Sequence, residues 1–121
     1  MLEPALVGWL ENTLKISAYW LKRPNNNNCV VFRRLSPGMI DANMATPNIN
    51  QDLYRFSLYH TDADTGLYLA NQLTQALHDF SGVIGAPPDV VCMQSASLSG
   101  GIDHLPDESG YRFERDFIIS Y

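Results

Sequence analysis

The sequence predicts an α+β domain in which two helices pack on an antiparallel sheet of about four strands. Three observations lead to this fold class. Two segments carry apolar residues at helical spacing, four segments have the composition or alternation of strands, and the strands come in consecutive pairs. The predicted order is α-β-β-α-β-β, with a long loop inside each strand pair. A chain of 121 residues has room for one such domain.

The first helix is predicted at the start of the chain, where apolar residues recur at spacings of three and four. The pattern continues to about Leu14 and, in weaker form, to Leu21. Pro4 fits the first helical turn, whereas Pro24 would end a helix. The asparagines that follow, Asn25–Asn28, predict a solvated turn.

The next two segments predict strands. Cys29–Leu35 is rich in residues that favour strands, and Asp52–His60 alternates, with Tyr54 and Phe56 on one face. Between them, Ser36–Gln51 is polar and has no periodicity, so we expect a long loop. Long loops in compact domains usually have a function.

The second helix has the clearest pattern and is expected to run from Asp62 to about Phe80. Its aspartates, Asp62 and Asp64, are placed to accept hydrogen bonds from the free N–H groups of the first turn. Gly82 and Gly85 are expected to end the helix.

The last part of the chain predicts two further strands. Val90–Leu98 is the first, and Ser99–Gly110 is expected to be a second long polar loop. Tyr111–Tyr121 alternates most clearly, with aromatic and aliphatic residues on one face and Arg112 and Glu114 on the other.

Charge and apolar content exclude several classes of protein. The chain has 8 basic and 13 acidic residues, and this net charge of −5 argues against a protein whose main task is to grip nucleic acid. No apolar run has the length of a membrane-spanning helix, and the first residues lack the basic region of a signal peptide. Cys29 and Cys92 are expected to be reduced and buried.

The sequence contains no convincing catalytic, metal or cofactor motif. The aspartates Asp62 and Asp64 follow a strand as in phosphotransferases, but Gly66 stands where those sites need a threonine. The three histidines are scattered, so no zinc signature exists. We therefore expect no enzyme, no cofactor and no metal, and interpret the aspartates as helix caps.

Four segments together have a familiar pattern: Arg55–His60, Thr65–Leu77 followed by Phe80-Ser81-Gly82, Val90–Leu98 and Tyr111–Tyr121. This pattern resembles the small tail-terminator, or tail-completion, proteins of long-tailed bacteriophages. The resemblance covers about residues 29–121 and identifies residues 1–121 as a single tail-terminator-like domain.

The resemblance implies a structural virion protein that is assembled in the host cytoplasm. Such proteins form a ring of identical copies, usually six, that caps the last ring of tail-tube protein. The ring then binds the neck, or connector, of the head, and DNA passes through its channel without sequence-specific binding. Two alternatives remain: another neck or tube-like component of a virion, and a small ligand-binding α+β domain.

The contacts of such a ring are expected in the two long loops and at two arginines. Arg33 and Arg34 are adjacent on a strand, so they face opposite sides of the sheet and are suited to salt bridges with neighbouring strands or subunits. Because an acidic channel would let DNA slide, we expect Asp and Glu rather than Lys and Arg to face it. The candidate interface residues are Arg33, Arg34, Pro37, Met39, Asp41, Met44, Asp103, His104, Asp107 and Glu108.

Overall fold

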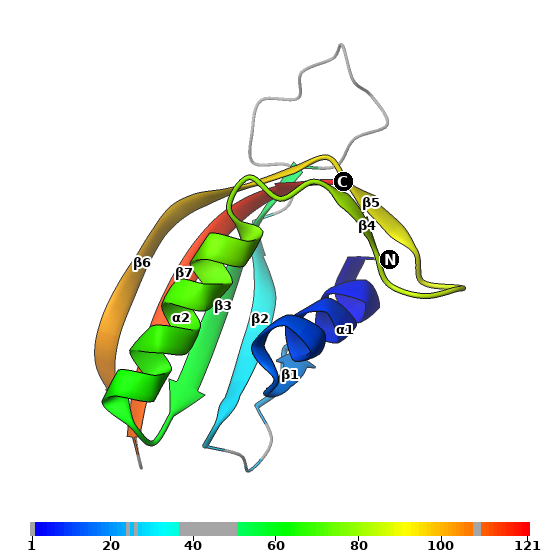
Figure 1. Ribbon diagram of the computed structural model, residues 1–121. Helices are drawn as coiled ribbons and strands as arrows, with labels where there is room; N and C mark the ends of the chain where they lie inside the picture. Colours follow the sequence, from blue (N-terminus) through cyan, green and yellow to red (C-terminus); the bar gives the residue numbers. More distant parts are fainter. Residues whose placement is uncertain (1, 24, 26, 37–50, 108–109) are drawn as a thin grey trace.

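The computed structural model describes residues 2–23, 25, 27–36, 51–107 and 110–121. Figure 1 shows two helices in front of a curved sheet, with a two-stranded hairpin at one end of the domain. In chain order the elements are α1 (Leu2–Leu14), β1 (Ser17–Trp20), β2 (Cys29–Ser36), β3 (Gln51–His60), α2 (Ala63–Leu77), β4 (Gly82–Ile84), β5 (Val91–Met93), β6 (Ser95–Asp107) and β7 (Gly110–Ser120).

The predicted α+β class with two helices is confirmed, but the predicted sheet of four antiparallel strands is wrong in its details. The main sheet has five strands in the order β1-β2-β3-β7-β6, and β4 and β5 form a second sheet of two strands. The main sheet is mixed, because β1 and β2 are parallel while the other neighbours are antiparallel. The order α-β-β-α-β-β therefore lacks three of the strands that the structure contains.

The first helix ends at Leu14, as the stronger part of its pattern predicts, and the weaker continuation to Leu21 is wrong. Lys15 has a φ of 60°, a left-handed conformation that stops the helix. The chain then enters β1, whose residues Ser17–Trp20 include two aromatic side chains that favour strands. β1 runs along one edge of the sheet, parallel to β2.

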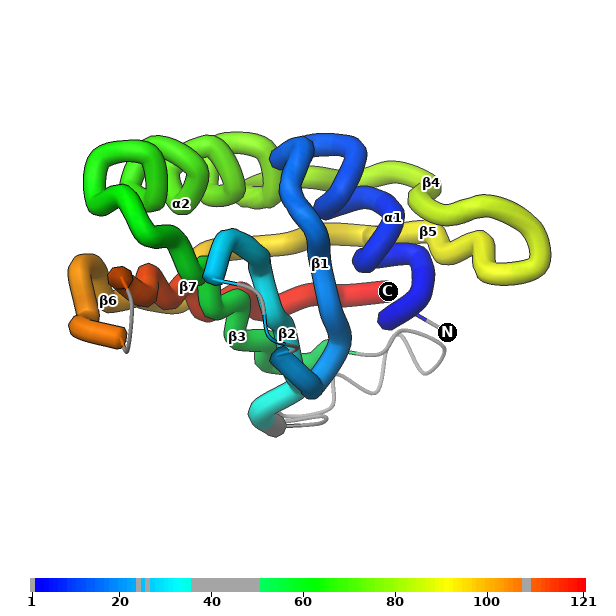
Figure 2. The backbone as a smooth tube through the Cα atoms, turned by 90° about the horizontal axis from the view of Figure 1, so that it is seen from below, coloured from blue at the N-terminus to red at the C-terminus, as the bar shows by residue number. Residues whose placement is uncertain are grey.

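The core lies between the sheet and the two helices. Figure 2 shows both helices on the same side of the sheet. The alternation predicted for β3 is confirmed, because every second residue from Asp52 to Leu58 is buried. Phe56 stacks on Phe32 and meets the edge of Phe117, with ring centroids 5.7 Å apart in both pairs. Other core residues are Leu6, Leu10, Leu58, Leu69, Leu73, Leu77, Phe113 and Ile119.

The polar segment from Ser99 onward is a strand rather than the predicted loop. β6 continues from Ser95 to Asp107 and pairs with β7 along its length, with two register shifts. Most of its side chains are exposed because it lies at the edge of the sheet, so it has no apolar alternation to reveal it. Its pairing depends on backbone N–H and C=O groups, which polar residues and glycines also provide.

The second helix ends earlier than predicted, and a hairpin follows it. α2 stops at Leu77, and Asp79 then adopts a φ of 63°. The strand predicted at Val90–Leu98 is divided between β5 and β6 at Gln94. Figure 2 shows the connection between β4 and β5 extending away from the rest of the domain. Cys92 is exposed on this hairpin, so the prediction that it is buried is wrong.

Neither described helix combines the length and the hydrophobicity needed to cross a bilayer.

Candidate functional site

The sheet has one face that no described helix covers, and most of its side chains are polar or charged. Phe32 and Phe56 point toward the helices, so the alternation of β2 and β3 directs Arg33 and Arg55 to the opposite face. We call this side of the sheet the arginine face. It is defined by Arg33, Arg55, Arg112, Glu114 and Asp116.

Ion pairs between β3 and β7 organise the middle of the arginine face. Arg55 donates from Nε and Nη2 to the two carboxylate oxygens of Asp116, at 2.9 Å and 3.0 Å. These hydrogen bonds raise the pKa of Arg55. Glu114 lies between two cations, because its oxygens are 4.0 Å from Arg55 Nε and 3.6 Å from Arg112 Nε. The geometry of the Arg55–Asp116 pair is bidentate, which fixes both side chains.

Arg33 is the unbalanced charge of this face. It is directly opposite Arg55 in the pairing of β2 with β3, and its side chain is exposed. Like charges at directly opposite positions of a sheet repel each other. Among the described residues no carboxylate lies within ion-pair distance of Arg33, whereas Arg55 is paired with Asp116. The positive charge of Arg33 is therefore available to an anionic group from outside this domain.

At one end of the same face Arg23 contacts both Tyr59 and Asp107, and we call this pair of contacts the Arg23 clamp. The guanidinium of Arg23 lies 3.8 Å from the centroid of the Tyr59 ring, and its Nη1 is 2.7 Å from Asp107 Oδ2. The contact joins the segment after β1 to the end of β6. Cys29, which is opposite Tyr59 in the sheet, is fully buried, and this burial raises the pKa of its thiol.

A second polar cluster lies on the helix side of the sheet. The hydroxyl of Tyr54 donates to Glu3 of α1 at 2.5 Å, and that of Tyr121 donates to Asp52 at 2.6 Å. Burial first, and the hydrogen bond with the carboxylate second, raises the pKa of each tyrosine. Arg34 Nη1 lies 3.7 Å from Asp52 Oδ2. This cluster fastens α1 to the sheet.

The first two predicted interface residues lie as expected on opposite faces of β2. Arg33 belongs to the arginine face, and Arg34 forms the predicted kind of salt bridge with a neighbouring strand through Asp52. The structure therefore does not bring these two side chains together.

Three other predicted interface residues lie on β6 instead of in a loop. Asp103 forms an ion pair with Arg115, and Asp107 forms one with Arg23. Both carboxylates are therefore paired within the domain. The His104 ring meets the edge of Phe113, with centroids 5.0 Å apart. The remaining candidates lie outside the described residues: Pro37, Met39, Asp41, Met44 and Glu108.

Arg115 is a buried charge that sequence reasoning missed. Its guanidinium donates to Asp103 Oδ1 at 2.6 Å, to Thr74 Oγ1 at 3.1 Å and to Asn71 Oδ1 at 3.2 Å. It thus connects β7 with β6 and α2. The alternation of β7 could have revealed this buried charge, because it places Arg115 on the same face as Phe113. A charge buried on that face needs polar partners.

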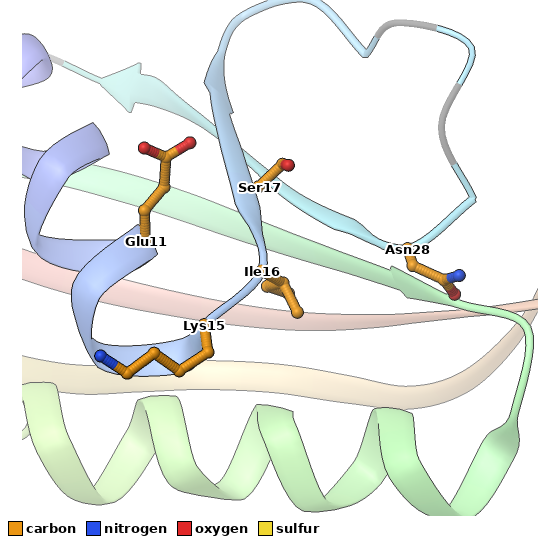
Figure 3. Close-up of a pocket in the computed structure, with 5 residues that line it drawn as sticks. All are labelled: Glu11, Lys15, Ile16, Ser17 and Asn28. Carbon is orange, nitrogen blue, oxygen red and sulfur yellow. The ribbon is translucent and has the colours of Figure 1, made fainter.

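Two hollows on the surface could receive a small group. Figure 3 shows the first, an open depression of about 550 Å³ lined by Glu11, Lys15, Ile16, Ser17 and Asn28. Its carboxylate is occupied, because Glu11 Oε2 accepts a hydrogen bond of 3.2 Å from the N–H of Ala18. The second hollow, of about 700 Å³, lies between α1 and the β4–β5 hairpin and includes Trp9, Phe80 and Val83 in its lining.

The described residues offer no assembled metal-binding group. No three His, Cys, Asp or Glu side chains among them lie close enough together to hold a metal ion. Asp62 caps α2 as predicted, because its Oδ2 accepts from the N–H of Thr65 at 2.9 Å and from its hydroxyl at 2.6 Å. These hydrogen bonds lower the pKa of Asp62. No protein-family model matches the sequence, and no curated protein matches it significantly.

Proposed function

We propose that this protein is a structural component of a bacteriophage virion. In this proposal it caps the end of the tail tube as a ring of identical copies and joins the tail to the neck of the head. DNA passes through the channel of the ring. The observation that carries the proposal is the resemblance of residues 29–121 to tail-terminator proteins.

The arrangement of the resembling segments supports this proposal. They lie in β3, in α2 and the residues after it, in β5 with the start of β6, and in β7, and α2 packs on β3 and β7. Gly66 of α2 lies so close to Phe113 of β7 that an added Cβ would clash with the ring. Three of the four similar segments are therefore neighbours in one packed unit of the fold.

The chemistry of the surface also supports a role in assembly. A head-to-tail ring needs two different contact surfaces on every copy. The domain has an arginine face on one side of its sheet and two helices on the other. The β4–β5 hairpin adds exposed apolar side chains, with Val83 66% and Val90 47% exposed. Exposed apolar groups on a projecting hairpin suit contact with the tube or the neck protein.

The direct experiment is electron microscopy of particles assembled with and without this protein. We expect tubes of variable length, not joined to heads, when the protein is missing, and tubes of uniform length joined to heads when it is supplied. Uniform tails attached to heads in its absence would contradict the proposal. Tails of normal length that fail to join heads would instead indicate a neck component.

A ligand-binding role is the second candidate, because the hollow between α1 and the hairpin has the volume of a small-molecule site. Its lining is largely apolar, with Asn12 and Asp89 among its few polar residues. Replacing Trp9 with alanine would remove most of one wall. Loss of a bound metabolite from the purified protein on this change, with normal tails in the virion, would favour the second candidate.

A further inference from the structure

We infer that the arginine face of one copy binds the outer surface of the two helices of the next copy. This inference rests on the proposed ring and specifies how its subunits meet. The helix surface is defined here by the exposed side chains of α1 and α2 at Glu11, Asn12, Asp64, Tyr68, Asn71 and Gln75.

The charges of the two surfaces are complementary. Within their bounds α1 and α2 contain Glu3, Glu11 and Asp64 but no Lys, Arg or His, and Lys15, the residue after α1, places one cation beside Asn12 at 3.5 Å. On the arginine face, the carboxylates of Glu114 and Asp116 are already paired with Arg55 and Arg112. Arg33 remains as an exposed cation opposite Arg55. An acidic surface placed over this face would supply Arg33 with an anion that no described residue of its own domain provides.

The composition of the helix surface is that of a protein contact rather than of a solvated helix. Tyr68 is 65% exposed, and its neighbours along α2 include the uncharged Asn71 and Gln75. Interfaces are enriched in tyrosine and depleted in lysine and glutamate relative to the rest of a protein surface. Asp64 is the sole charge within the 15 residues of α2, so this helix has few of the charges that usually keep an exposed helix in water.

The edges of the sheet are poorly suited to joining subunits, which leaves its faces. At β1, Glu11 already accepts the outward N–H of Ala18. At β6, His78 Nδ1 accepts the N–H of Leu98, and the N–H of Asp79 donates to Ala96. Beyond these contacts β6 has register shifts and contains Pro106, features that oppose the addition of another strand.

The two surfaces lie on opposite sides of the domain, so their contact is head to tail. Figure 2 shows the helices on one side of the sheet, and the register directs Arg33 to the other side. A contact between two different surfaces leaves one of each free on every dimer, so it continues until a ring closes or, where the rotation does not close, as a filament. It cannot stop at a two-fold dimer.

The experiment uses two variants that each damage one surface. Arg33→Glu reverses the charge of the arginine face, and Tyr68→Arg places a cation on the helix surface. We expect each purified variant to self-associate more than about tenfold more weakly than the natural protein, because like charges then meet. Mixed in equal amounts, the two variants can join through the one intact surface of each, and their altered surfaces bring opposite charges together, so the mixture should recover dimers and larger oligomers by native mass spectrometry.

Lys22→Glu is the matched control, because it makes the same change of charge in the exposed connection after β1. It should leave the mass of the oligomer unchanged. Thermal unfolding of Arg33→Glu separates association from folding, since a glutamate opposite Arg55 is a favourable pair and should not destabilise the monomer.

Three results would overturn the inference. They are a natural protein that stays monomeric at high concentration, an Arg33→Glu variant with the oligomer mass of the natural protein, and a mixture of the variants that forms no dimers. If Arg33→Glu abolished binding of double-stranded DNA without changing the oligomer mass, the arginine face would be a DNA surface instead. Tail assembly tests the function separately, because normal tails made with Arg33→Glu would reject this contact and leave the proposed function intact.

Discussion

Arg115 Nε, on β7, donates a hydrogen bond of 3.1 Å to Thr74 Oγ1 on α2, so a polar contact joins the sheet to the helix that covers it. The same guanidinium reaches Asn71 on α2 and Asp103 on β6. Because Arg115 is only 8% exposed, these acceptors replace the water that the charge has lost.

We expect Arg115→Met to lower the free energy of unfolding by about 2 kcal/mol, because it removes a buried guanidinium that makes two hydrogen bonds to α2 and an ion pair with the partly exposed Asp103. Denaturant unfolding measures this change. Arg112→Met is the control on the other face of the same strand, where the side chain is 37% exposed, and it should cost less than about 1 kcal/mol. Equal losses in the two variants would contradict the role assigned to Arg115.

Two glycines in helices should respond to alanine with opposite signs. At Gly66 an added Cβ would clash with the ring of Phe113, whereas at Gly8 it would meet nothing within 4 Å. We therefore expect Gly66→Ala to cost about 1–3 kcal/mol through overpacking. Gly8→Ala should add about 0.5–1 kcal/mol because alanine favours a helix. Stabilisation by both changes, measured by thermal unfolding, would show that α2 does not pack this closely on β7.

The buried tyrosines predict a loss of stability at high pH. The pKa of Tyr54 and that of Tyr121 are raised in the folded protein, so their contribution is fully present below the unfolded value of about 10. It is lost as the pH rises from that value toward the folded pKa. We expect unfolding to begin above about pH 10, together with the absorbance change of tyrosinate.

Tyr54→Phe tests the same contact at neutral pH. It removes the hydrogen bond to Glu3 and should cost about 2 kcal/mol, since the acceptor is a carboxylate. The decline of stability above about pH 10 should become shallower. Tyr68→Phe, at an exposed position, is the control and should change neither quantity. An unchanged alkaline profile in Tyr54→Phe would contradict the assignment.

The two thiols should react at very different rates with an aromatic disulfide reagent. Cys92 is exposed, while Cys29 is buried and its pKa is raised by that burial. Because the thiolate is the reacting species, we expect one fast thiol in the folded protein and the second only on unfolding. Cys92→Ser should abolish the fast phase, and Cys29→Ser should leave it in place. Two fast thiols would show that the Arg23 clamp opens readily.

The elements that could be predicted from the sequence are those with one buried, apolar face and one exposed, polar face. β3 and β7 alternate because one face of each is buried, and α2 has both an apolar stripe and a capping aspartate, Asp62. β1 escaped prediction because four residues are too few to show a period. β6 escaped because only Ala96 of its side chains is buried, while its partners are the backbone groups of β7.

The candidate site was predictable only in part, because its residues come from strands that are far apart in the sequence. Alternation places Arg112 and Glu114 on the polar face of β7, but their relation to Arg55 depends on the register between β3 and β7. That register joins residues about 60 positions apart, and no local pattern specifies it. Arg33 could be assigned to a face, yet its position opposite Arg55 required the fold.

The place of β7 in the sheet has a consequence for how the protein is made. β7 comes last among the described strands in sequence but lies between β3 and β6, and β6 is hydrogen-bonded to the rest of the main sheet only through it. A ribosome that has not yet released Gly110–Ser120 therefore holds a chain whose main sheet is divided. We expect the main sheet to form only after β7 has left the ribosome, and then at the slow rates of proteins with distant strand pairings.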